Sequence, residues 1–289
     1  MPNVHVNDLD LEYDTFGDPA APPMLLVMGL GTQLTAWRPE FCKRLAARGF
    51  RVIRFDNRDV GLSTKLDDGP QPDLGAIMGG DPTSAPYLLK DMAADAVGLL
   101  DALGIGRAHV TGASMGGMIV QELLIRYADR VASACSIMST TGNPTVGRPS
   151  HEAAGGLFAP PANSREEAIE RSVAANRLIS SPAYPKSDEE LRALATESYD
   201  RAYCPAGKTR HLAAVMASGD RTEALKSVSA PVLVIHGDAD TLVHVSGGRA
   251  TADAIPGAKL IEFPGMSHDL PVELWDDFFD AIVANAEKA

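Results

Sequence analysis

The stretch "VTGASMGGMIV", residues 110–120, decides the fold of this 289-residue chain. Two β-branched residues lead into three glycines that surround Ser114, and an apolar run follows. Glycine gives up conformational order and fills no space, so such a cluster marks a backbone that other segments approach closely. The order strand, Gly-x-Ser-x-Gly, helix predicts a nucleophile elbow, a sharp turn that holds a serine hydroxyl above the edge of a sheet.

Two other interpretations of these glycines were weighed. A Walker-type phosphate loop is excluded because no Gly-Lys-Ser/Thr follows, whereas a purely structural glycine turn stays open. The strand–helix context favours the elbow, since side chains at positions 112 and 116 would collide with the neighbouring strand and helix. The backbone N–H of Met115 would then lie at a helix N-terminus, where negative charge is favoured.

The sequence around the elbow alternates between strand-like and helix-like segments. Residues 3–16 alternate polar and apolar residues and predict an antiparallel edge hairpin. Further strands are predicted at 22–29, 51–58, 107–112, 131–139, 231–238 and 258–263, and helices at 36–50, 88–104, 115–127 and from about 271. Residues 64–86, rich in Asp, Gly and Pro, are predicted to be a long loop. This alternation predicts an α/β fold whose mostly parallel sheet of eight strands is flanked by helices.

The alternation stops at about residue 141. Residues 142–228 contain no strand-like run, and three helix starts of the capping-box type are expected at Ser164–Glu167, Ser187–Glu190 and Asp220–Glu223. We therefore predict a core domain of residues 1–141 and 229–289, and a helical cap of residues 142–228 inserted after the sixth strand.

Composition narrows the function class. The net charge of −12 argues against nucleic acid or an anionic membrane as a partner. Three widely spaced cysteines without a C-x-x-C pair indicate neither a disulfide framework nor a zinc site. No signal peptide and no apolar run long enough to span a bilayer is visible, so a cytoplasmic protein is expected. A homodimer is left open.

A serine hydroxyl needs a base, and the base needs an acid to hold it in the correct tautomer. His268 lies in the loop "FPGMSHDLP" after the strand 258–263, at the sheet end where the elbow also emerges. The loop after the strand 231–238 offers Asp240, with Asp238 as the alternative, at the carboxyl ends of the strands where such sites assemble. The remaining histidines lie in or beside strands, in the cap, or after a strand end: His5, His109, His236, His151, His211 and His244.

Five segments together resemble the α/β-hydrolase family: "LLVMGLG", "FDNRDVGLS", "GASMGG", "VLVIHGDAD" and "GMSHDLP". The resemblance implies that Ser114 is the nucleophile, His268 the base and Asp240 the acid, with no metal or cofactor. It also implies an oxyanion hole made by the backbone N–H groups of Leu30 and Met115.

Details of the segments resemble one subgroup. Met28 stands where the family often has His, and Asp59 follows Arg58 where Gly is usual. Both features resemble the subgroup that includes aclacinomycin methylesterase and related bacterial carboxylesterases. Ser114 argues against haloalkane dehalogenase-like and epoxide hydrolase-like members, which carry aspartate at the nucleophile position.

The reaction implied is hydrolysis of a carboxylic ester of a small, largely apolar substrate through an acyl-enzyme. A lactonase, a carbon–carbon bond hydrolase or a cofactor-free perhydrolase could use the same three side chains. A ligand-binding protein without catalysis is the alternative of another class. The cap is expected to roof a pocket lined by Gly29, Trp37 and Met216.

Overall fold

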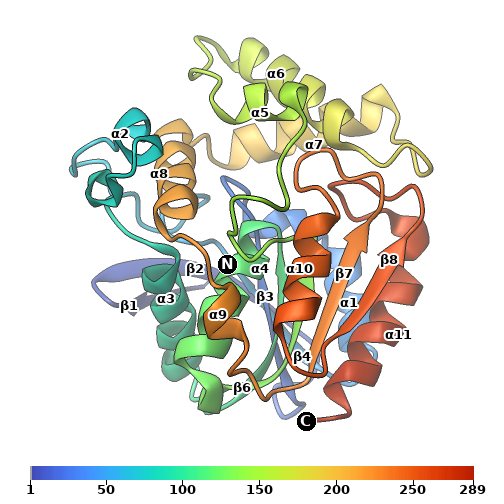
Figure 1. The fold of residues 1–289 in the computed structure, drawn as a ribbon. Helices are drawn as coiled ribbons and strands as arrows, with labels where there is room; N and C mark the ends of the chain where they lie inside the picture. The colour runs from blue at the N-terminus through green and yellow to red at the C-terminus, as the bar shows by residue number, and fades with distance from the viewer. Residues whose placement is uncertain (1) are drawn as a thin grey trace.

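The computed structural model describes residues 2–289. Eight strands form one sheet in the order β1-β2-β4-β3-β5-β6-β7-β8 (Figure 1). The strands are β1 (Asn3–Val6), β2 (Leu9–Phe16), β3 (Pro23–Val27), β4 (Arg51–Phe55), β5 (Ala108–Ala113), β6 (Val131–Ile137), β7 (Val232–Gly237) and β8 (Lys259–Phe263). Strand β2 is antiparallel to β1 and β4, and the other neighbours are parallel, which confirms the predicted fold class.

Helices cover both faces of the sheet and bury its apolar side chains. The helices are α1 (Pro39–Ala46), α2 (Leu74–Met78), α3 (Leu89–Ala102), α4 (Met115–Arg126), α5 (His151–Leu157), α6 (Arg165–Ile179), α7 (Asp188–Arg201), α8 (Pro205–Ala217), α9 (Thr222–Leu225), α10 (Ser246–Ala254) and α11 (Trp275–Ala286). One core cluster joins the sheet to α3 and α4, and the other joins it to α1 and α11. No helix within residues 2–289 is long and apolar enough to cross a membrane.

The predicted edge hairpin is present as β1 and β2. Asn7 and Asp8 join the two strands with φ angles of 48° and 63°. Two central residues with positive φ give the turn a twist that matches the right-handed twist of the flanking strands, and Asn and Asp tolerate that conformation.

The prediction of a long loop at residues 64–86 is wrong in part. The short helix α2 and a 3-10 turn, Pro82–Ser84, interrupt it. The carboxylate of Asp73 accepts from the Ala76 N–H, and that of Asp81 accepts from the Thr83 N–H. Aspartate is common in loops and also at helix N-caps, and here both aspartates cap short helices. The composition of residues 64–86 therefore did not distinguish a loop from two short helical turns.

Residues 142–228 carry α5–α9 and no strand. Figure 1 shows α5, α6 and α7 beyond the end of the sheet to which β7 and β8 point. Ser187 and Glu190 form the predicted capping box at the start of α7. Ser164 caps α6, but the predicted box is incomplete because Glu167 accepts from the Asn163 N–H. The capping box predicted at Asp220–Glu223 is wrong, because Asp220 instead accepts from the Thr222 N–H and Glu223 pairs with Lys226. The division into core and cap domains stays a prediction.

Candidate active site

The turn between β5 and α4 forces Ser114 into an unusual backbone conformation, with φ 57° and ψ −121°. A Cβ at Gly112 would collide with the carbonyl oxygen of Gly116, and a Cβ at Gly116 would collide with that of Val27 on β3. A Cβ at Gly117 would lie 2.6 Å from that of Ser139. Close approach of helix and strand backbones therefore requires these glycines, while the surrounding structure keeps the serine in its strained geometry.

Three loops at the carboxyl ends of parallel strands bring Ser114, His268 and Asp240 together. Nε2 of His268 lies 2.9 Å from Oγ of Ser114, and Nδ1 lies 2.7 Å from Oδ2 of Asp240. Asp240 follows β7 and His268 follows β8, and both are nearly buried at 4% and 8% exposure. Because a carboxylate can only accept, Nδ1 carries the proton and Nε2 is free to accept one from the serine.

Asp240 is held as an anion by the groups around it. Its Oδ1 accepts from the N–H groups of Leu242 and Val243, both at 2.8 Å. His236 lies behind it, with Nε2 3.4 Å from Oδ2. Burial alone would raise the pKa of Asp240, but His268, His236 and the Val243 N–H outweigh it and lower that pKa. The carboxylate is therefore ionised wherever the protein is folded near neutral pH.

Asp238, the alternative acid, lies elsewhere. It is exposed, and its Oδ1 accepts from the Gly265 N–H at 2.7 Å, so it supports the turn that leads to His268. His236 is a member of the site that sequence reasoning left unassigned. Its position four residues before Asp240, at the carboxyl end of a strand, was the available signal.

The two expected oxyanion donors lie on either side of the serine. Met115 is the first residue of α4, so its N–H has no acceptor within the helix. Leu30 follows Gly29, where a Cβ would lie 3.1 Å from Cβ of Ser114 and 3.6 Å from its Oγ. Within residues 2–289, neither the Leu30 nor the Met115 N–H donates a hydrogen bond. Both donors are thus free to bind a developing oxyanion beside Ser114.

The prediction that Trp37 lines the substrate pocket is wrong. Its side chain is fully buried between the sheet and α1, with its ring 5.3 Å from that of Phe41. A large indole just after the Gly29 loop gains more by joining the apolar core than by facing a pocket. Met216 is half-buried on α8, and its place in the pocket stays a prediction.

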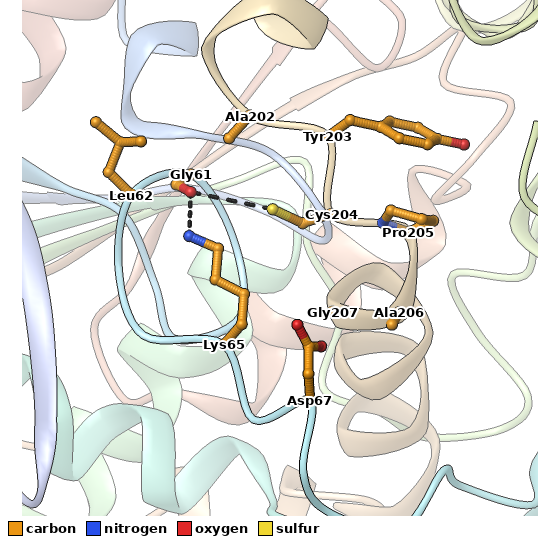
Figure 2. A pocket seen from close by; sticks show the side chains of 10 residues that line it. All are labelled: Gly61, Leu62, Lys65, Asp67, Ala202, Tyr203, Cys204, Pro205, Ala206 and Gly207. Atoms are coloured by element: carbon orange, nitrogen blue, oxygen red, sulfur yellow. Dashed lines mark hydrogen bonds between the residues drawn. The ribbon is translucent and has the colours of Figure 1, made fainter. Parts of the chain in front are cut away.

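Two cavities lie beside the cap segment. The first, of about 390 Å³, lies between the loop after β4 and the turn that joins α7 to α8. Figure 2 shows Lys65 and Cys204 pointing at the carbonyl oxygen of Gly61 across this cavity. The second, of about 350 Å³, is bordered by the sequence neighbours of Asp240 and His268, namely Ala239, Thr241 and Ser267. Both are lined by residues other than Ser114.

The connection between α6 and α7 holds the loop that carries His268. The His268 N–H donates to the carbonyl oxygen of Ile179, at the end of α6, at 3.0 Å. The neighbouring Asp269 accepts from the hydroxyl of Ser181 and pairs with Lys186. Movement of the α6–α7 connection would therefore move the imidazole.

The unusual Asp59 belongs to a second contact between residues 142–228 and the rest of the chain. Arg210 on α8 donates two hydrogen bonds to its carboxylate, at 2.9 and 2.7 Å, and both side chains are fully buried. Tyr87 Oη and the Leu66 N–H donate to the same carboxylate at 2.6 and 2.8 Å. Burial opposes ionisation, but these donors lower the pKa of Asp59 below its ordinary value. The sequence showed that Asp59 stands where the family usually has glycine. It did not show that Arg210, 151 residues further along the chain, is the partner of Asp59.

Comparison with known proteins agrees with this geometry. The model of the alpha/beta hydrolase fold family matches residues 22–273. A rhodomycin D methylesterase of Streptomyces sp. (strain C5) is 29% identical over 302 residues, covering 98% of this chain and 97% of its own. Another, from Streptomyces peucetius, is 28% identical over the same shares. The crystal structure of the enol-lactonase from Burkholderia xenovorans superposes with a TM-score of 0.76 at 25% identity, covering 99% of this chain and all of that one.

Proposed function

The chain belongs to the family of the alpha/beta hydrolase fold, and on that premise we propose that it hydrolyses carboxylic esters through an acyl-enzyme. In this proposal Ser114 is the nucleophile, His268 the general base and Asp240 the acid that orients it. The observation that carries it is the pair of hydrogen bonds, 2.9 and 2.7 Å, that link the three side chains in that order.

Acylation follows from the arrangement of donors and acceptors. Oγ of Ser114 attacks the ester carbonyl carbon while Nε2 of His268 accepts its proton. Negative charge builds on the carbonyl oxygen, which the N–H groups of Leu30 and Met115 bind. Asp240 stabilises the imidazolium that forms. Collapse of the tetrahedral intermediate breaks the ester C–O bond, and His268 returns the proton to the departing alcohol.

Deacylation repeats the cycle with water in place of the serine. His268 removes a proton from the water as it attacks the acyl carbon, and the same two N–H groups bind the oxyanion. The proton then returns to Oγ of Ser114 as the carboxylic acid leaves. Every proton transfer uses His268, so no metal ion or cofactor is required for the steps proposed.

We propose a methyl ester as the substrate class, because two relatives that are similar over 98% of this chain are named methylesterases. The helices α5–α9 are proposed to form the cap that roofs the site. A lactone is the second candidate, because the enol-lactonase structure resembles this chain along its full length. Parallel kinetics with aromatic methyl esters and with lactones of equal size would rank the two by kcat/KM.

Replacement of the nucleophile tests the proposal. Ser114→Ala is expected to lower kcat for p-nitrophenyl butyrate by on the order of 10⁴–10⁶-fold and to abolish labelling by a fluorophosphonate. Ser136→Ala is a matched control, since this buried serine lies on the adjacent β6 and its hydroxyl has no partner within residues 2–289. Unchanged turnover in a folded Ser114→Ala protein would refute the role of Ser114 as the nucleophile. A wild-type chain that the probe does not label would refute the esterase proposal and favour a ligand-binding protein.

A further inference from the structure

A buried histidine of the cap segment, His211 on α8, bridges two loops of the core. Its Nδ1 lies 3.1 Å from the Gly31 N–H, and its Nε2 lies 2.7 Å from the carbonyl oxygen of Arg58. A carbonyl can only accept, so Nε2 carries the proton and Nδ1 accepts from Gly31. The ring is fully buried. Both ring nitrogens are therefore committed to backbone groups in one neutral tautomer.

One of those backbone groups adjoins the proposed oxyanion donor. Gly31 follows Leu30 directly, and its φ of 65° turns the chain sharply at this point. Two hydrogen bonds from Thr32 close this loop. The Thr32 N–H donates to the Gly29 carbonyl oxygen at 3.2 Å, and the Thr32 hydroxyl donates to the Leu30 carbonyl oxygen at 3.1 Å. Since the Leu30–Gly31 peptide is a rigid plane, a bond to its N–H also holds the Leu30 Cα and carbonyl group. The Leu30 N–H lies in the preceding plane, whose Gly29 oxygen is held by Thr32.

Helix α8 is a fixed support for this contact. Arg210, the residue before His211, makes the buried ion pair with Asp59. A Cβ at Gly207 would collide with the Asp59 carbonyl oxygen, so the start of α8 packs directly on the loop after β4. The side chain of Lys208 packs on Gly31, because a Cβ added at Gly31 would lie 3.2 Å from the Lys208 Cβ. His211 therefore acts from a helix that cannot shift without breaking these contacts.

We propose that His211 is a positioning residue for catalysis, holding the Gly31 N–H so that the neighbouring Leu30 N–H stays aimed at the oxyanion. This inference rests on the proposed function. An oxyanion donor works only when it lies about 2.7–3.1 Å from the oxygen that becomes charged, and a displacement of about 1 Å can cost on the order of 10²-fold in rate. The effect belongs to the transition state, so kcat should respond and KM should not.

Two substitutions separate the two hydrogen bonds of His211. Asparagine places its amide oxygen near the position of Nδ1 and can still accept from Gly31, whereas glutamine places its amide nitrogen near Nε2 and keeps only the bond to Arg58. We expect His211→Gln to lower kcat by about 10–100-fold with little change in KM, and to weaken a trifluoromethyl ketone inhibitor by the same factor. His211→Asn should retain most of kcat. Thr209→Ala, on the same helix, is the control and should leave kcat unchanged.

The outcomes discriminate between positioning and mere packing. Loss of kcat in proportion to loss of Tm, equal for both variants, would overturn the proposal, as would a folded His211→Gln protein with kcat within twofold of wild type. Should neither variant fold, amide exchange of the wild-type chain decides, and a Gly31 amide that exchanges as fast as an unbonded loop amide would overturn the proposal. A wild-type chain whose Ser114 resists the fluorophosphonate would instead refute the proposed function.

Discussion

The buried ion pair between Asp59 and Arg210 permits a quantitative prediction. Replacing Arg210 by methionine keeps most of the side-chain volume but leaves the Asp59 carboxylate fully buried with only the Tyr87 hydroxyl and the Leu66 N–H as donors. Removing one partner of a buried pair costs about 3–5 kcal/mol, because the remaining charge is uncompensated. In a chain of this size that loss corresponds to a fall in Tm of about 6–10 °C.

The loss of stability in Arg210→Met comes from the buried Asp59 carboxylate that is left without its partner. Removing this charge as well should restore part of the stability. Asp59→Asn preserves the shape and tolerates the φ of 70° at this position. The double variant Asp59→Asn/Arg210→Met buries no charge, and we expect it to be more stable than Arg210→Met alone by about 2 kcal/mol. Asp67 also loses Arg210, but its side chain is 65% exposed and water replaces the partner.

Urea unfolding followed by tryptophan fluorescence measures these differences, since both Trp37 and Trp275 are buried. The matched control is Arg165→Met, which breaks an equally well-formed two-bond pair with Asp200 on the exposed surface of α6 and α7. That variant should unfold within error of the wild-type midpoint. A double variant no more stable than Arg210→Met, or a surface control that costs as much, would refute the reasoning.

Three further predictions follow from particular contacts. Gly116→Ala should destabilise the chain by more than about 2 kcal/mol in urea unfolding, because its Cβ meets the Val27 backbone, whereas Gly155→Ala in α5 meets nothing and should be tolerated. Burial lowers the pKa of His211 from 6.5 to about 4, although the Arg58 carbonyl and Asp59 oppose this shift. Between those pH values only the unfolded chain binds the proton, so the free energy of unfolding should fall by about 3 kcal/mol as the pH drops from 6.5 to 4. A free energy of unfolding that stays constant over this pH range would contradict the prediction. Burial also raises the pKa of Cys42 to about 12 and leaves Cys135 inaccessible, so a disulfide reagent at pH 8 should titrate at most one thiol in the native chain and three in urea.

The family and the fold were predicted from local patterns, and the family model and the sheet topology confirm both. The similarity to methylesterases agrees with the predicted subgroup. Each pattern reports on its own segment: an apolar run is a buried strand, and glycines around a serine allow a helix to pack against it. The positions of Ser114, Asp240 and His268 after parallel strands were predicted in the same way, because such loops meet at one edge of the sheet. Their catalytic roles stay the proposal.

What the sequence determined by itself was therefore the order of strands and helices, the elbow, and the three side chains expected at one sheet edge. Only the tertiary structure decided that Trp37 belongs to the core, that Arg210 neutralises Asp59, and that His211 supports Gly31. The reason is physical: a strand, a helix or a tight turn depends on neighbours within a few residues, whereas these contacts join residues up to 180 positions apart. Nothing in the periodicity of α8 distinguishes a histidine that bonds two distant backbones from one that merely fills the helix.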